Sequence, residues 1–204
     1  VVSAELLQLA ASAYRPLLTE DAYATFKKGG FYTQRMKHAP EEIYVTTVNT
    51  VLYYIYNPET EGDADPFGQF AWLEKILTTY RKEGKKTILT AHSCPGVSER
   101  YNWTQQFREE YNDRFVELVA EYDDVIVAML CGHLHIDTFR VYHKGNKGVV
   151  GLNSPSLDTW LGVNPSLRYY SINNAVIDEF ATFHVDINNT FVEWQLTYNT
   201  KEEY

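Results

Sequence analysis

Residues 124–139 read DVIVAMLCGHLHIDTF, and this stretch decides how the rest of the chain is interpreted. Its first part, DVIVAML over 124–130, is apolar and β-branched, which predicts a buried strand. An earlier stretch, KKTILTAH over 85–92, has the same character and ends on His92. Since His133 and His135 follow the later strand, imidazole side chains are predicted at the ends of both strands.

Helical patterns lie between and before the predicted strands. One helix is predicted to open at Asp65-Pro66, an N-cap followed by proline, and another to be capped by Thr104. Residues 42–54 are β-branched and aromatic and predict an earlier strand. The order strand, helix, strand, helix, strand is typical of a parallel sheet with crossover helices.

The two ends of the chain differ in character. At the start, Ser3 and Thr19 are typical N-caps, and Gly29-Gly30 closes the second helix. After residue 137, DTFRVYHKGNKGVVGLN predicts a hairpin that turns at Gly145-Asn146. The segments LRYYSINN, ATFHVDI and WQLTY predict further strands. We therefore predict an α/β fold in which parallel strand–helix repeats are followed by antiparallel strands, within one domain.

Composition excludes several classes of protein. The 204 residues suffice for one domain with a sizeable core, and 45% hydrophobic residues argue against disorder. The net charge of −9 argues against nucleic-acid binding, which needs clustered Lys and Arg. No apolar run approaches the roughly 18 residues of a membrane span, so no transmembrane segment is predicted. The first residues, VVSAELLQLA, lack the basic region of a signal peptide.

The histidines at the strand ends predict a metal site. Ligands of open α/β sheets lie beyond the carboxyl ends of the strands, where His92, His133 and His135 are expected to meet. Neutral imidazole suits zinc, iron or manganese, although a single strand-end histidine is more often structural. Gly132 is expected to permit a close backbone approach that a Cβ would block. His38, His143 and His184 are isolated, and surface or hydrogen-bonded roles are expected for them.

Cysteine and asparagine positions bear on the cellular compartment. Cys94 and Cys131 are too few for a disulfide framework; they would pair in a secreted protein or stay buried thiols in an intracellular one. A thiolate ligand from Cys94 is a further alternative. Asn102 and Asn188 each begin an Asn-x-Thr triplet, the acceptor pattern for glycosylation, which gives modest support to secretion.

Several segments, taken in order, resemble one branch of a known family. TAHSCPG (90–96) followed by CGHLHIDTF (131–139) resembles the second half of a calcineurin-like metallophosphoesterase, and specifically the acid sphingomyelinase and sphingomyelinase-like phosphodiesterase branch. Four further segments resemble the same branch: FKKGGFYT (26–33), DPFGQFAWLEKIL (65–77), SPSLDTWLGVNPSLRYY (154–170) and WQLTYNTKEEY (194–204). The resemblance implies part of an αββα sandwich and a metal-dependent phosphoric diester hydrolase.

The resemblance also implies a ligand set and a mechanism. His92 and His133 would bind one metal and His135 a second, usually zinc in this branch, and hydroxide bridging the metals would attack phosphorus. The family's first half supplies Asp-x-His, Gly-Asp and Gly-Asn-His motifs. Asp-x-His and Gly-Asn-His do not occur here, and Gly62-Asp63 lies in the wrong place relative to the matching segments.

The motif pattern therefore matches only part of the family's catalytic domain. Residues 1–204 are interpreted as its C-terminal half, with the N-terminal half as a required partner that supplies the bridging carboxylate and the proton donor. No residue of this chain is assigned as catalytic. We expect two zinc ions in a complete domain, one or none in this chain, and little hydrolysis by the chain alone. The sequence departs from the family at two places: Ala91 replaces a usual Gly, and the loop after His92 reads Ser93-Cys94-Pro95-Gly96 where the family usually has an apolar residue and then two prolines.

The rim of the site suggests how an organic phosphoester is held. Trp160 is a candidate for substrate binding, because an aromatic face attracts a choline ammonium by cation–π interaction; packing in a loop is the alternative. Asp137 is expected either to orient a metal-binding histidine or only to begin a strand. The substrate is expected to be a lipid head group or nucleotide-like phosphodiester, acted on in a secreted, lysosomal or other extracellular setting. The alternatives are a polyphosphate or phosphomonoester hydrolase on the same scaffold, and a non-catalytic binding module.

Overall fold

The computed structural model describes residues 3–39, 42–100, 104–190 and 192–203. Within these ranges the helices are α1 (Ala4–Tyr14), α2 (Glu20–Gly29), α3 (Gln69–Glu83), α4 (Glu109–Glu121) and α5 (Thr200–Glu203). The strands are β1 (Tyr32–Arg35), β2 (Ile43–Thr47), β3 (Lys86–Thr90), β4 (Ile126–Cys131), β5 (Thr138–Lys144), β6 (Lys147–Asn153), β7 (Ser166–Asn173), β8 (Val176–His184) and β9 (Gln195–Asn199). No helix in these ranges has the length and apolar character needed to cross a membrane.

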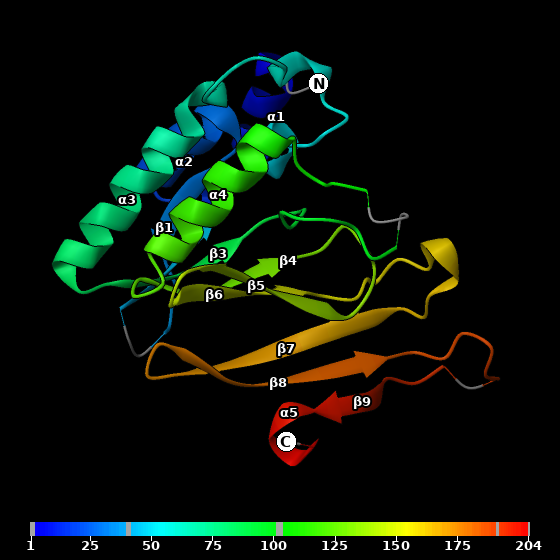
Figure 1. The fold of residues 1–204 in the computed structure, drawn as a ribbon. Helices are drawn as coiled ribbons and strands as arrows, with labels where there is room; N and C mark the ends of the chain where they lie inside the picture. The colour runs from blue at the N-terminus through cyan, green and yellow to red at the C-terminus, as the bar shows by residue number, and fades with distance from the viewer. Residues whose placement is uncertain (1–2, 40–41, 101–103, 191, 204) are drawn as a thin grey trace.

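The strands form two sheets. The larger has the order β1-β2-β3-β4-β6-β5, in which β2, β3, β4 and β6 run parallel and β1 and β5 are antiparallel to their neighbours. The smaller sheet, β7-β8-β9, is antiparallel. Figure 1 shows α3 and α4 over one face of the larger sheet, with β7 and β8 across the other. The predicted α/β fold, with parallel strand–helix repeats before antiparallel strands, is confirmed.

An aromatic cluster holds α3 and α4 against the larger sheet. Tyr53, which has no exposed surface, stacks on Phe70 of α3 with ring centroids 4.6 Å apart. The same Tyr53 ring contacts Phe107, Tyr111 and Phe115, and these rings are at most 1% exposed. Burial of so many rings supplies a large hydrophobic contribution. The cluster also holds in place α3 and α4, the helices that precede and follow β3 in the chain. It therefore helps to set the position of the sheet edge at which β3 and β4 end.

The predicted helix ends at the start of the chain are confirmed. The Ser3 hydroxyl accepts from Leu6 N at 3.1 Å, and the Thr19 hydroxyl accepts from Ala22 N at 3.3 Å. Gly30 follows α2 in the left-handed region with φ 76°, which costs glycine little. These ends depend on residues within a turn of each other, and so local sequence predicts them well.

The predicted cap at Thr104 is wrong, because α4 begins at Glu109 with Arg108 as its N-cap residue. Residues 104–106 instead pair with the loop after β3. Thr104 O accepts from Ser98 N at 2.8 Å, and Gln106 N donates to Gly96 O at 2.8 Å. These backbone bonds extend the segment and prevent a helix from starting there.

The strand predicted over residues 42–54 is longer than the observed β2, and the helix predicted to open at Asp65-Pro66 begins later, at Gln69. β2 ends at Thr47, and Asn49 caps a 3-10 turn over Thr50–Leu52. Asp65 precedes a 3-10 turn over Pro66–Gly68, and its carboxylate accepts from Phe70 N at 2.7 Å in the first turn of α3. Sequence patterns also did not predict β1. By contrast, the hairpin of β5 and β6 turns between Lys144 and Lys147, as predicted.

Candidate metal centre

Two of the predicted ligands lie in contact at one edge of the larger sheet. β3 and β4 are parallel neighbours with Thr90 opposite Leu130, so both strands end at the same edge. His92 follows β3 and His133 follows β4, and His92 Nε2 lies 3.1 Å from His133 Nδ1. Their ring centroids are 4.9 Å apart. The structure thus brings together side chains 41 positions apart in the sequence, while metal binding by them stays a prediction.

His135 lies beside this pair and faces a different neighbour. Its ring meets the ring of Trp160 with centroids 5.7 Å apart in an edge contact. His135 Nδ1 is buried and has no hydrogen-bond partner among the described residues. A buried, unpaired nitrogen is unfavourable unless a ligand satisfies it. Within the described part of the chain, however, no three His, Cys, Asp or Glu side chains are grouped closely enough to hold a metal ion together.

The surroundings favour neutral imidazoles at the two contacting histidines. Burial lowers the pKa of His92, and the charge of His135 lowers it further. Burial likewise lowers the pKa of His133, with smaller contributions from His92 and His135. A neutral imidazole is the form that binds a metal ion. The two side chains are therefore held in the protonation state that ligation requires.

The backbone of the turn after β4 is strained at both histidines. His133 has φ 70° and His135 has φ 55°, both in the left-handed region that non-glycine residues seldom occupy. Such conformations cost about 1–3 kcal/mol each and persist where the surrounding structure holds them, which is common at functional sites. Leu134 between them is buried, 2% exposed, and anchors the turn between the two imidazoles.

The expectation for Gly132 is wrong. A Cβ at this position would lie 3.7 Å from His92 O, an ordinary van der Waals distance, and Gly132 does not have a positive φ. The close approach is instead a hydrogen bond from Gly132 N to His92 O at 2.9 Å, which any residue except proline could make. The unusual geometry of the turn therefore belongs to the histidines and not to the glycine.

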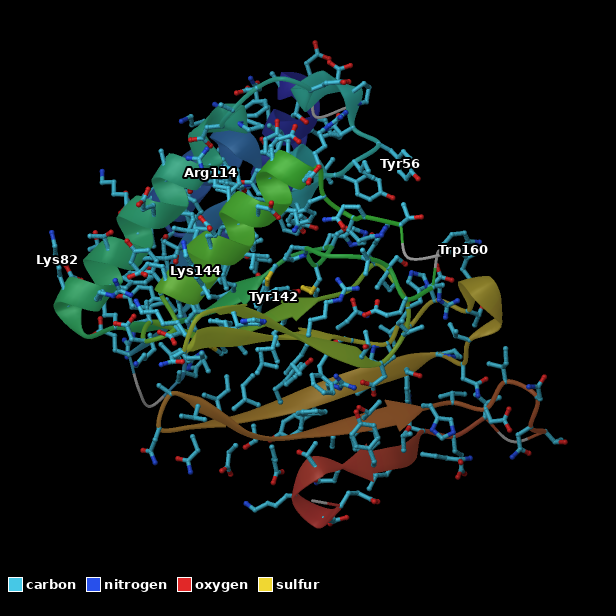
Figure 2. The ribbon with its side chains drawn as sticks, viewed as in Figure 1. Tyr56, Lys82, Arg114, Tyr142, Lys144 and Trp160 are labelled. Carbon is cyan, nitrogen blue, oxygen red and sulfur yellow. A yellow bond between two sulfur atoms is a disulfide. The ribbon has the colours of Figure 1, made fainter. Side chains whose placement is uncertain are left out.

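Cys94 and Cys131 form a disulfide with Cα atoms 5.6 Å apart, visible as yellow sulfurs in Figure 2. The two cysteines are 3% and 5% exposed. This pairing decides between the alternatives of a disulfide and buried thiols. It also removes Cys94 as a thiolate ligand, since its sulfur is bonded to Cys131. The sequence carried a signal for the pair, because one cysteine follows His92 and the other precedes His133 at neighbouring strand ends.

An aromatic cavity of about 300 Å³ opens beside His133. It is lined by Tyr54, Tyr56, Thr104, Gln106, His133 and Trp160. Tyr56 and Trp160 are 68% and 59% exposed, and Figure 2 shows them at the same end of the molecule. The Tyr54 ring lies between Tyr56 and His133, with centroids 5.6 and 5.5 Å away. The sequence patterns did not predict Tyr54 or Tyr56 as site residues. A signal existed, because β2 is parallel to β3 and the loop that follows β2 must therefore begin at this same edge.

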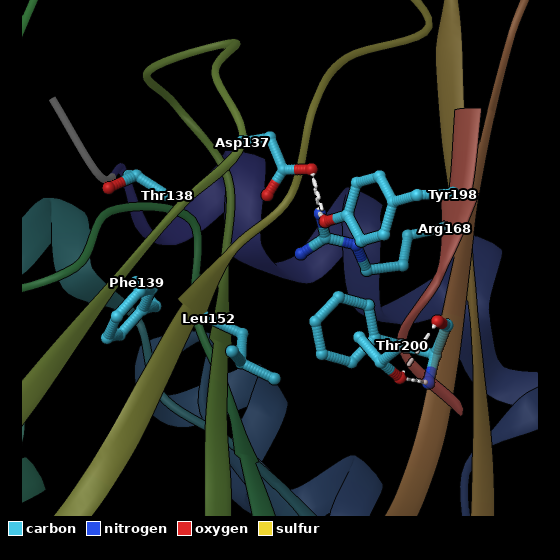
Figure 3. Close-up of a pocket in the computed structure, with 8 residues that line it drawn as sticks. Asp137, Thr138, Phe139, Leu152, Arg168, Tyr198 and Thr200 are labelled. Carbon is cyan, nitrogen blue, oxygen red and sulfur yellow. Dashed lines mark hydrogen bonds and ion pairs between the residues drawn. The ribbon is translucent and has the colours of Figure 1, made fainter. Parts of the chain in front are cut away.

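Asp137 binds residues of the smaller sheet. Its carboxylate accepts a hydrogen bond from Tyr198 Oη at 2.6 Å and forms an ion pair with Arg168. Arg168 also donates to Thr182 Oγ1 and to Tyr198 Oη, at 2.9 and 2.8 Å. Asp137, Arg168 and Tyr198 line a cavity of about 530 Å³, and Figure 3 shows their side chains together at its wall. The orienting role predicted for Asp137 toward a histidine stays a prediction.

The other predicted positions differ in how they lie relative to this edge. His184 lines a cavity of about 360 Å³ together with His135 and Asp137, so the expectation that it is isolated is wrong. His38 and His143 are exposed, and His184 Nδ1 lies 2.8 Å from Thr197 Oγ1. Asn188 is exposed in the loop after β8, where an attached glycan would meet no obstruction from burial. Asn102, with Tyr101 and Trp103, lies outside the described residues.

Known proteins with similar sequences support the motif resemblance. The mouse protein named acid sphingomyelinase-like phosphodiesterase 3b is 28% identical over 211 residues, which cover 95% of this chain and 46% of the mouse protein. Sphingomyelinase phosphodiesterase C of Dictyostelium discoideum is 29% identical over 219 residues, covering 97% of this chain and 48% of that protein. The chain is homologous to the acid sphingomyelinase-like phosphodiesterases. The resemblance inferred from its motifs is confirmed.

Further comparisons define the extent of this similarity. The human cyclic GMP-AMP phosphodiesterase SMPDL3A is 33% identical over 141 residues, covering 69% of this chain and 31% of that protein. The chain thus spans about half the length, or less, of the curated relatives it matches. No protein-family model matches the chain. A solved Staphylococcus aureus structure, described as a candidate 5′-nucleotidase, aligns over 82% of this chain and 28% of its own with a TM-score of 0.38 and 7% identity.

Proposed function

We propose that this chain supplies the His92, His133 and His135 side of a metal-dependent phosphodiesterase site. The contact between His92 Nε2 and His133 Nδ1, 3.1 Å, carries the proposal. Two nitrogens that bind one tetrahedral zinc at about 2.0–2.1 Å lie roughly 3.3 Å apart, so the pair needs little movement to share an ion. The buried Nδ1 of His135, which has no hydrogen-bond partner among the described residues, is a second observation that fits a metal.

Each residue of the site has a separate task in this proposal. A bound metal ion polarises a phosphoryl oxygen and acidifies water. His92 and His133 supply neutral nitrogen donors to one ion, and His135 supplies a donor to a second. The turn that holds His133 and His135 keeps these donors in place at the cost of backbone strain. We further propose zinc as the metal and residues 1–204 as the C-terminal half of the catalytic domain, which hydrolyses substrate poorly without the carboxylates of the other half.

The aromatic cavity supports an organic phosphodiester as substrate. Tyr54, Tyr56 and Trp160 surround space directly beside His133, where the organic group of a bound phosphoester would project. Aromatic faces bind a choline ammonium by cation–π attraction and a nucleobase by stacking. A lipid head group and a nucleotide therefore both suit this cavity, in line with the names of the relatives. An inorganic polyphosphate would make no use of it.

The proposed location is secreted, lysosomal or otherwise extracellular. A buried disulfide between Cys94 and Cys131 supports an oxidising environment, because such bonds persist mainly outside the cytosol. The exposed Asn188 triplet supports the same proposal, since glycosylation occurs in the secretory pathway. Mapping of glycans on the protein from its native source tests this: unmodified asparagines together with reduced cysteines would contradict it.

A non-catalytic binding module is the second candidate function. It is favoured by one observation, namely that no three metal-binding side chains group together among the described residues. In such a protein the histidines at the strand ends would serve only the fold, and the aromatic cavity would bind a ligand without reaction.

Zinc titration of the full 204-residue chain discriminates between the candidates. We expect wild type to bind zinc measurably by calorimetry, His133→Ala to lose at least tenfold in affinity, and His143→Ala, on the exposed face of β5, to bind as wild type does. Equal binding by all three proteins, or none, favours the binding module. Hydrolysis of a chromogenic phosphodiester by the chain alone at rates usual for phosphodiesterases would contradict the proposed need for the other half.

A further inference from the structure

The disulfide joins the two chain segments that carry the contacting imidazoles. Cys94 lies two residues after His92, and Cys131, the last residue of β4, lies two residues before His133. The bond therefore crosses from one strand end to the next, two residues along the chain from each histidine of the pair. Both cysteines belong to the buried core cluster and are 3% and 5% exposed, so the link is embedded in the close-packed interior.

Non-covalent contacts fix the loop after His92 on its outer side. Arg140 of β5 donates to Pro95 O at 2.7 Å and to Val97 O at 2.6 Å. These bonds hold the residues that follow Cys94, but they do not reach the turn at His133. Between the two imidazole-bearing segments themselves, Gly132 N donates to His92 O at 2.9 Å. The covalent link is thus the strong connection at the point where the imidazoles meet.

The strained turn makes such a link consequential. His133 holds a left-handed φ of 70°, a conformation that relaxes unless neighbouring structure prevents it. The disulfide fixes residue 131 immediately before the turn, and the buried Leu134 fixes the residue after His133. Without the disulfide, residues 131–133 are held only by hydrogen bonds, from Gly132 N to His92 O and from Ser154 N to Cys131 O, each 2.9 Å, and by the pairing of β4 with β6. We expect the strain to relax against these weaker restraints, which moves His133 Nδ1 away from His92 Nε2.

We infer that the Cys94–Cys131 disulfide is a positioning element for the metal-binding imidazoles of His92 and His133. The consequence for zinc rests on the proposed function, whereas the positioning of the two rings does not. The sulfurs touch neither metal nor substrate in this role, and they act only through the backbone of the two histidines. Loss of groups that orient metal ligands typically weakens metal affinity by about 10- to 100-fold, and we expect a loss of that size here.

The test uses the double substitution Cys94→Ala and Cys131→Ala in the full chain, because alanine cannot provide a thiolate that would itself bind zinc. The matched control is Leu77→Ala in α3, a fully buried residue whose truncation destabilises the core without touching the histidine loops. The first readout is the imidazole ¹⁵N spectrum of His92 and His133 without metal, assigned through His92→Gln and His133→Gln. The second is zinc affinity by calorimetry, measured under conditions in which circular dichroism shows every variant folded.

The expected result is that the double variant shifts both imidazole signals and binds zinc at least tenfold more weakly, while Leu77→Ala retains both properties. Unchanged imidazole signals in the folded double variant overturn the inference. Shifts of equal size in Leu77→Ala also overturn it, because the disulfide would then act through general stability. If wild type binds no zinc, the proposed function fails, and the imidazole spectra without metal still decide the role of the disulfide.

Discussion

The bridge between the two sheets offers a direct test of how a buried charge contributes to this fold. The Arg168 side chain on β7 is 1% exposed and pairs with Asp137, whose side chain is 36% exposed. The Phe180 ring lies 4.5 Å from the guanidinium carbon. Asp137→Asn keeps an acceptor oxygen for Tyr198 but removes the negative charge. The buried guanidinium then lacks its counterion, which is the costly way to break such a pair.

The expected magnitude follows from these exposures. Removing one partner of a fully buried ion pair costs about 3–5 kcal/mol, and water around the partly exposed Asp137 places this pair at or below the lower end, about 2–3 kcal/mol. Arg168→Met removes the buried guanidinium, so no unpaired buried charge remains. The unfolding free energy should therefore fall by less, about 1–2 kcal/mol, chiefly because the cation–π contact with Phe180 is lost. Because the two side chains interact directly, the double variant should cost at least about 1 kcal/mol less than the sum of the two single changes.

Urea denaturation followed by circular dichroism, with a chelator present to exclude metal effects, measures these free energies of unfolding. A cost below about 1 kcal/mol for Asp137→Asn would refute the reasoning, because it would mean that water or another group neutralises Arg168. Additive costs in the double variant would refute it as well. Thr159→Ser, a small change at an exposed position in the segment before β7, is the control and should leave the unfolding free energy unchanged.

Three further predictions concern the core, the acid stability and the cavity. Phe115→Ala should lower the free energy of unfolding by about 3–5 kcal/mol, because the ring has no exposed surface and its removal leaves a cavity; a loss under about 1.5 kcal/mol in urea denaturation would contradict the described aromatic cluster. Burial alone would raise the pKa of Glu99, but the hydrogen bond from Arg140, a backbone hydrogen bond and the charge of Arg140 together outweigh this and hold the pKa below its ordinary value. Glu99 therefore stabilises the fold above its unfolded-state pKa, near 4.3, and this stability is lost as pH falls through the lower folded value. Glu99→Gln should flatten the acid limb of a plot of stability against pH, and an unaltered acid limb would rule out the pairing. Trp160→Ala in the active protein should raise KM for a phosphocholine ester about 2- to 30-fold, the equivalent of 0.5–2 kcal/mol of cation–π attraction, and leave KM for an inorganic polyphosphate unchanged; equal effects on both substrates would argue that Trp160 only packs in its loop.

The sequence by itself determined the features that depend on neighbours along the chain. The caps at Ser3 and Thr19, the strands that end before His92 and His133, and the β5–β6 hairpin all follow from residues within a few positions of one another. The convergence of the two histidines also followed, since parallel strands joined by a crossover helix must end at the same edge. Where prediction failed, as at Thr104, a backbone partner distant in the sequence decided the conformation.

Only the tertiary structure decided which distant side chains meet. The choice of a disulfide over free thiols at Cys94 and Cys131 was decided only there. The bridge from Asp137 to Arg168 and the cavity formed by Tyr54, Tyr56 and Trp160 join segments that no local pattern relates. The physical reason is that such contacts depend on the order of strands and the packing of one sheet against the other. Periodicity records which face of an element is buried, but it does not record what that face will touch.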